Sequence, residues 1–63
     1  MSIGSRIKEL CEDHDITLWR LAKAIGVAPH SLYGYANDKC YPNAEILHEI
    51  AIYFNVEMEC FWK

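Results

Sequence analysis

Apolar residues at the start of the chain recur at the spacing of an α-helix. Four of them share one predicted face: Ile3, Ile7, Leu10 and Cys11. Intervals of four, three and one residues place side chains on the same side of a helix. Ser2 is a suitable N-cap, because its hydroxyl can accept a first-turn N–H, and the polar run at residues 12–15 ends the pattern. The pattern predicts a first helix over residues 3–13.

A second amphipathic segment follows and stops at a glycine. Its apolar face consists of Leu18, Leu21, Ala22 and Ile25. Thr17 is a suitable N-cap, and Gly26 stands where a helix often ends in a left-handed residue, a conformation that glycine adopts cheaply. Pro29 suits the first position of a further helix, because its missing N–H would have no partner there. Leu32 and Tyr35, three residues apart, can face inward, so two short helices joined by a sharp turn are predicted.

The last third of the chain predicts a turn, a longer helix and a short final helix. Residues 37–39 have turn composition, and Asn43 is a suitable cap for the helix that follows. The inner stripe of this helix consists of Leu47, Ile50, Ala51 and Phe54. Asn55 ends it, and the apolar positions within residues 56–61 suggest the final helix. With no strand pattern, repeat or linker, we expect residues 1–63 to form a single five-helix, all-α domain.

Composition is that of a small globular domain. The chain has 63 residues, of which 52% are hydrophobic and 24% charged. A domain of this size buries only about 60% of its unfolded surface, so every apolar face contributes to its marginal stability. No apolar run approaches the roughly 18 residues of a membrane span, and the N-terminus lacks the apolar core of a signal peptide. We therefore expect a cytoplasmic protein without a membrane segment.

Cysteine, histidine and carboxylate placement gives no sign of a metal site or an enzyme. Three widely spaced cysteines indicate reduced thiols rather than a disulfide framework. The nearest approach to ligand spacing is Cys11 with His14, for which a half-buried cysteine and a surface histidine is the simpler interpretation. No catalytic set has a motif around it, and a chain this short can hardly enclose an ordinary ligand pocket. We predict no cofactor, no metal, no small-molecule ligand and no enzymatic activity.

Charge is distributed unevenly along the chain. The formal net charge is −3, the wrong sign for a nonspecific nucleic-acid binder. Residues 17–41, however, carry three cations against one acid, whereas the remainder carries three cations against eight acids. The centre is therefore mildly basic and the rest acidic. Such an asymmetry suits DNA, and it also suits an acidic protein partner.

Several stretches resemble the Cro/C1-type helix–turn–helix domain, the lambda-repressor-like fold of phage repressors and many bacterial regulators. They are IGSRIKEL, ITLWRLAKAIGV, YPNAEILHEIAIYFNV and EMECFW, which together span about residues 3–62. Within the motif, the small Ala22 suits a close helix crossing and Gly26 suits the turn. Leu32 and Tyr35 stand where the second helix packs onto the first. The resemblance implies a lambda-repressor-like fold.

The functional implication is a sequence-specific transcriptional regulator, a repressor, that binds double-stranded DNA at a palindromic site. In this family the second helix of the motif lies in the major groove and the first crosses the backbone. Matching positions imply base contacts from Pro29, His30, Tyr33 and Gly34. They imply phosphate contacts from Thr17, Leu18, Ser31, Asn37, Lys39 and Asn43. Arg20, on the preceding helix, is a further phosphate candidate.

The chain departs from the family pattern at several positions. Leu18 stands where the family often has a phosphate-bracing Gln, Pro29 offers no donor to a base, and Gly34 has no side chain. These departures and the acidic total favour an alternative, a helix–turn–helix scaffold used as a protein-interaction module, such as an antirepressor or a regulator's partner. The family's internal Arg–Glu pair is replaced at Cys11 and Ala36, a joint loss that the fold can tolerate.

A dimer is expected from the small number of cations. With few phosphate contacts available to each copy, a single domain should bind DNA weakly, and two-fold pairing would raise its affinity. Four large apolar residues fall off the predicted inner stripes of the last two helices: Ile46, Ile52, Tyr53 and Trp62. Those that do not pack against the first helix can form a contact. We predict a homodimer through the C-terminal region, at least on DNA.

Overall fold

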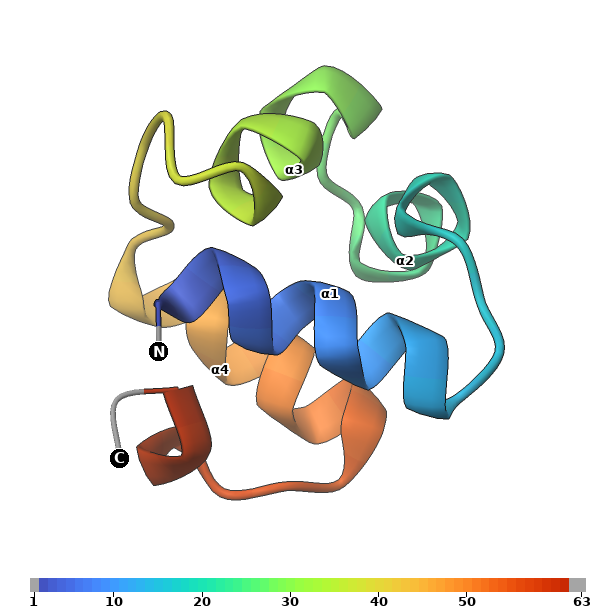
Figure 1. Ribbon diagram of the computed structural model, residues 1–63, viewed down its shortest axis with the longest axis vertical. Coiled ribbons are helices and arrows are strands. Elements are labelled where there is room, and N and C mark those ends of the chain that lie inside the picture. The colour runs from blue at the N-terminus through green and yellow to red at the C-terminus, as the bar shows by residue number, and fades with distance from the viewer. Residues whose placement is uncertain (1, 62–63) are drawn as a thin grey trace.

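Five helical elements follow one another in residues 2–61, the part of the chain that the computed structural model describes (Figure 1). They are α1 (Ile3–Asp13), α2 (Leu18–Ile25), α3 (Pro29–Ala36), α4 (Ala44–Phe54) and η1 (Met58–Phe61). The predicted all-α class is confirmed. The fifth element differs in kind, because it is a four-residue turn of 3-10 helix. A segment this short closes i to i+3 hydrogen bonds, such as that from the Cys60 N–H to the Glu57 carbonyl at 3.1 Å.

Three of the four α-helices begin at the predicted caps. The side chains of Ser2, Thr17 and Asn43 each accept a hydrogen bond from the N–H three residues later, at 3.0, 3.1 and 2.9 Å respectively. Each bond satisfies one of the N–H groups that a helix start leaves unpaired. Helix α3 begins differently. Its N-cap is Ala28, which makes no side-chain cap, and Pro29 occupies the first turn.

All four α-helices are followed by a residue with left-handed backbone. These residues are Asp15, Gly26, Asp38 and Asn55, with φ between 54° and 78°. In every case the next N–H donates to the carbonyl five residues back, at 2.9 to 3.0 Å. This pattern is a Schellman end, which satisfies orphan carbonyls and reverses the chain. Only Gly26 is a glycine, and Asp and Asn are the side chains that tolerate this conformation best.

One apolar core holds the helices together. In Figure 1, α2 and α3 lie to one side of α1 and η1 to the other, with α4 behind α1 in this view. The residues that are at most 2% exposed and contribute the largest side chains are Ile7, Leu21, Leu32, Ile50 and Phe61. The predicted inner stripes of α1, α2 and α4 all contribute to this core, and Tyr35 packs against it partly buried. No helix among the described residues is long and apolar enough to cross a membrane.

The core of the described residues contains no buried polar or charged side chain. Cys11 is 4% exposed and Ala36 is fully buried, so both positions of the replaced charge pair lie in the core. Burial raises the pKa of the Cys11 thiol, which keeps it neutral. The joint replacement therefore leaves no charge without a partner in the interior.

Helix α1 touches the end of α3 through backbone. A Cβ placed on Gly4 would lie 2.5 Å from the carbonyl oxygen of Ala36 and 2.7 Å from that of Tyr35. The Asp38 carboxylate fixes the same corner. It accepts hydrogen bonds from the Ser2 hydroxyl at 2.8 Å and from the Gly4 N–H at 3.2 Å. Glycine at position 4 thus allows the close approach on which the placement of α3 depends.

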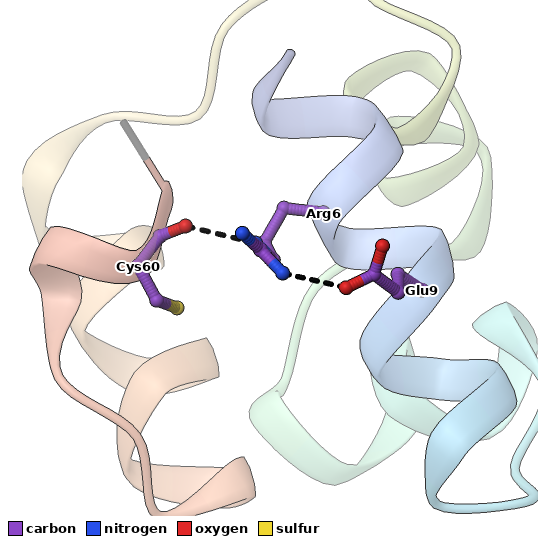
Figure 2. Close-up of polar contacts among 3 residues, drawn as sticks. All are labelled: Arg6, Glu9 and Cys60. Atoms are coloured by element: carbon purple, nitrogen blue, oxygen red, sulfur yellow. Dashed lines mark hydrogen bonds and ion pairs between the residues drawn. The ribbon is translucent and has the colours of Figure 1, made fainter. Parts of the chain in front are cut away.

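The Arg6 side chain joins η1 to α1. Figure 2 shows the Arg6 guanidinium between the two elements, with Nε donating to the Cys60 carbonyl at 2.9 Å and a terminal nitrogen paired with Glu9. The Arg6 side chain is 24% exposed, so the ion pair is only partly shielded from water. The contact fixes η1 beside α1, where Phe61 completes the core.

Candidate nucleic-acid interface

Helix α3 presents two adjacent side chains to solvent. Its inner face is occupied by Leu32 and Ala36, both fully buried. His30 and Tyr33 are exposed, and 42% of Tyr33 is accessible. A separation of three residues places both on one side of the helix. The structure thus brings together the two predicted base-contacting residues that have hydrogen-bonding side chains.

The turn before α3 sets where this face lies. Gly26 has φ +78° and ends α2, and the Val27 N–H donates to the Ala22 carbonyl at 2.9 Å. Ala22 itself is fully buried, as expected for a residue at a close helix crossing. Three residues after Gly26, Pro29 opens α3. The helix–turn–helix predicted from the sequence is therefore present, with α3 following α2 after a three-residue connection.

Pro29 and Gly34, the other two predicted base contacts, are both partly buried. Pro29 occupies the first turn of α3, as predicted for a helix starter. At Gly34 an added Cβ would point at the Cys40 sulfur, 3.0 Å away. That direction is towards the loop after the helix. Gly34 can therefore offer a binding partner only its own backbone atoms.

Most of the predicted phosphate-contacting residues stand at the ends of elements. Thr17 and Leu18 stand at the start of α2, and Asn43 stands before α4. Asn37 follows α3, and its side-chain amide donates to the Tyr33 carbonyl at 2.9 Å. Ser31 lies partly buried in the first turn of α3. Contact sites on three elements can follow the curved DNA backbone, whereas sites on one helix would reach only one short part of it.

Several of these side chains already have structural tasks. The Thr17 hydroxyl and the Asn43 amide oxygen each cap a helix. Leu18 is partly buried and packs against the core, so it can offer a phosphate only its N–H, one of those that a helix start leaves unpaired. Arg20 and Lys39 are exposed and are the charged members of the set.

The charge asymmetry predicted from the sequence is also present in space. The exposed cations of the central segment lie on α2 and just after α3: Arg20, Lys23 and Lys39. The one acid of that segment, Asp38, is engaged with Ser2 and the α1 backbone. Most carboxylates lie on α1, α4 and the C-terminal segment. Among the described residues, α2 and the turn after α3 thus carry more cations than acids.

Two exposed aromatic residues near this interface were not singled out from the sequence. Tyr41, in the α3–α4 connection between Lys39 and Asn43, is 79% exposed, and Trp19 on α2 is 51% exposed. The sequence offered one indirect indication that they are exposed: neither residue falls on a predicted apolar stripe. Exposure of so much aromatic surface became evident only once the connection and α2 were placed.

The cysteine and histidine side chains that were considered as metal ligands lie apart from one another. Cys11 is buried, whereas His14 is exposed with its ring centroid 4.8 Å from that of Phe54. Cys40 is exposed at the end of the turn after α3. Among residues 2–61, no three His, Cys, Asp or Glu side chains come together as a possible metal site.

Comparison with protein families gives one match that covers most of the chain. The family described as the Cro/C1-type HTH DNA-binding domain matches residues 6–59, from the first turns of α1 into η1. Neither the curated proteins nor the solved structures compared with the chain contain a match. The matched region includes the whole α2–turn–α3 unit and the helices that support it.

Proposed function

Because the chain belongs to the Cro/C1-type helix–turn–helix family of DNA-binding transcription regulators, we propose that it is a cytoplasmic repressor. It binds a short palindromic duplex as a homodimer with α3 in the major groove. Residues 1–63 act in this proposal as one domain, and the family is not one of enzymes. The observation that carries the proposal is the outward exposure of His30 and Tyr33 on α3.

The chemistry of these two side chains suits base edges. A histidine can donate to a guanine or to a phosphate. A tyrosine can donate its hydroxyl, or lay its ring against a thymine methyl. Pro29 adds an apolar contact at the start of the helix. Gly34 can take part only through its backbone, because its Cβ direction faces the Cys40 sulfur. Specificity in this proposal rests mainly on His30 and Tyr33.

Phosphate contacts come from the elements around α3. Lys39 and Arg20 supply the charge, and Thr17, Leu18, Ser31, Asn37 and Asn43 supply backbone or side-chain hydrogen bonds. Helix starts favour phosphates, because their free N–H groups and the helix dipole both attract negative charge. About two to four phosphates per copy can be neutralised, so one copy alone binds weakly and with a clear dependence on salt.

A homodimer supplies the missing affinity. Ile46 is partly buried against the core, and Trp62 lies outside the described residues. Of the predicted set, Ile52 and Tyr53 on α4 are 60% and 46% exposed. We assign the dimer contact to the side of α4 that carries Ile52, together with the C-terminal segment. Sedimentation that shows one copy both free and on palindromic DNA would remove this part of the proposal.

Selection from random duplex DNA tests the proposal. The intact chain is incubated with the pool at low and at moderate salt, and bound duplexes are sequenced over successive rounds. We expect a palindrome to be enriched, with half-sites about one helical turn apart or a multiple of that distance. Enrichment of no sequence at either salt concentration would overturn the proposed sequence-specific repressor.

A protein-interaction module is the second candidate, and particular positions favour it. Leu18, at the family's phosphate-bracing position, is partly buried. Gly34 presents no side chain, and the formal net charge is −3. The candidates differ in their response to substitution. If DNA is the target, Lys39→Ala weakens binding to all sequences and lowers the salt slope by about one. If protein is the target, the same change leaves DNA retention as it was.

A further inference from the structure

A shallow hollow of about 500 Å³ lies between α2 and α4. Its lining consists of Trp19, Arg20, Lys23, Ala24 and Tyr53. Four of these residues lie on the outer face of α2 and one lies near the end of α4, while α3 contributes none. The hollow is therefore separate from the side chains proposed to contact bases, and insertion of α3 into a groove leaves it outside the base contacts.

Two large aromatic side chains are left half exposed at this hollow. Trp19 is 51% and Tyr53 is 46% accessible. The Lys23 ammonium lies 5.4 Å from the centroid of the Trp19 ring, which is a cation–π contact. Aromatic side chains and arginine are the residues enriched at the centres of protein interfaces. An exposed tryptophan beside an exposed arginine thus has the composition of a protein-binding surface.

Charge identifies the kind of partner. The lining contains two cations and no acid, whereas the chain outside residues 17–41 has three cations against eight acids. An acidic segment is repelled by the acid-rich parts of the molecule and attracted by the two cations of the lining, which favours its approach to the α2 side. We propose that the hollow binds an acidic segment of another protein. Its aliphatic or aromatic side chain lies on Trp19 and Tyr53, and its carboxylates pair with Arg20 and Lys23.

The two other possible occupants fit less well. In a two-fold dimer the same patch meets itself, so Arg20 and Lys23 of one copy would face those of the other. Duplex phosphates can pair with the two cations, but an intact duplex offers no open base face on which Trp19 and Tyr53 can stack. Arg20 also belongs to the proposed phosphate contacts. The test therefore uses the other lining residues.

The test is a peptide selection on the intact chain. A library of random short peptides is displayed and selected against the immobilised protein, and the most enriched peptide is synthesised and titrated. We expect enriched peptides to combine Asp or Glu with Leu, Ile, Phe or Trp. Trp19→Ala and Lys23→Glu should each weaken the synthetic peptide about tenfold. Circular dichroism checks that both variants stay folded.

Two exposed residues outside the lining provide matched controls. His48→Ala removes an exposed ring from α4, and Lys8→Glu reverses a charge on α1. Neither should change peptide affinity. Enrichment of neutral or basic peptides, or of none, would overturn the proposal, as would a peptide that binds Trp19→Ala as tightly as the unmodified chain. Loss of DNA binding in Trp19→Ala, or loss of self-association measured by sedimentation, would assign the hollow to DNA or to a second copy instead.

Discussion

The two ends of α3 are built in opposite ways. At its C-terminal end the backbone of Ala36 lies against Gly4, and the following turn is tied to α1 by the Asp38 carboxylate. At its N-terminal end Ala28 makes no side-chain cap, and the next residue after Pro29, His30, is exposed. At the C-terminal end of α3, polar groups bond within the protein. At the N-terminal end, polar groups are left accessible to a partner.

This difference separates positioning from recognition within a helix of eight residues. Contacts to α1 hold the C-terminal end of α3 in place, because backbone packed against backbone cannot shift without moving a whole helix. The N-terminal half packs inward through Leu32, which is fully buried. The outward side chain of His30 is exposed and free to meet a partner. Changes at the anchored end should therefore alter stability, and changes at the open face should alter binding.

The largest expected effect is at the anchored end, in Gly4→Ala. The new Cβ would lie 2.5 Å from the Ala36 carbonyl oxygen, and backbone on both sides leaves nothing flexible to move away. We expect a loss of about 2 to 3 kcal/mol in the free energy of unfolding, measured by urea denaturation. Ser5→Ala, one position along α1 at an exposed site, is the control. Equal midpoints for Gly4→Ala and the unmodified chain would contradict the close contact.

Asp38→Ala comes next, because it removes the tie and strains the turn. Hydrogen bonds from the Ser2 hydroxyl and the Gly4 N–H are lost, and alanine at φ 61° adds backbone strain. Together these should lower the free energy of unfolding by about 2 kcal/mol. Asp38→Asn keeps an acceptor and a side chain that tolerates this backbone, so it should lose less than half as much. An equal loss in the two variants would contradict this account, because asparagine keeps both an acceptor and a side chain that tolerates this backbone.

Substitutions at the open face should spare stability and weaken DNA binding. Tyr33→Ala removes an exposed ring and hydroxyl, and we expect a loss of about 1 to 2 kcal/mol in affinity for a selected duplex. His30→Ala should behave similarly. Fluorescence anisotropy measures the affinity, and the urea midpoint should stay within about 0.5 kcal/mol of the unmodified chain. Unchanged affinity in both variants would remove these side chains from the interface.

Gly34→Ala should have the smallest effect. It tests the middle of α3, between the anchored end and the open face. Alanine gains about 1 kcal/mol in helix propensity over glycine, while its Cβ would lie 3.0 Å from the Cys40 sulfur. Cys40 is exposed and its side chain can rotate away. The two effects should leave the free energy of unfolding within about 0.5 kcal/mol or slightly raised. A loss above about 1.5 kcal/mol would mean that the Cys40 sulfur is held in place.

Local signals in the sequence predicted most of the fold. Ser2, Thr17 and Asn43 were recognised as caps because capping depends on residues three apart in the chain. Helix stripes were recognised because core faces repeat at the helical period, as at Ile50 and Phe54. The last element was expected as a fifth helix without its type, and a single turn gives too few residues for a period to distinguish 3-10 from α geometry.

The candidate site was predictable only in part. The order of helix, glycine turn and helix marked His30 and Tyr33 as outward-facing, because Leu32 accounts for the inner face of the same helix. The same pattern placed Gly34 among the base contacts without indicating that its Cβ direction faces Cys40. The sequence did not identify Trp19 and Tyr41 as part of the surface, because the helical pattern predicts positions only for residues on an apolar stripe.

By itself, the sequence determined the helices, their caps and the Gly26 turn, because each depends on neighbours along the chain. Tertiary structure alone decided that Gly4 meets the end of α3, that Asp38 ties its turn to α1, and that Trp19 and Tyr53 share one hollow. These contacts join segments tens of residues apart in sequence. Such pairings depend on how whole helices pack, and a local pattern of polar and apolar residues carries no information about which surfaces will meet.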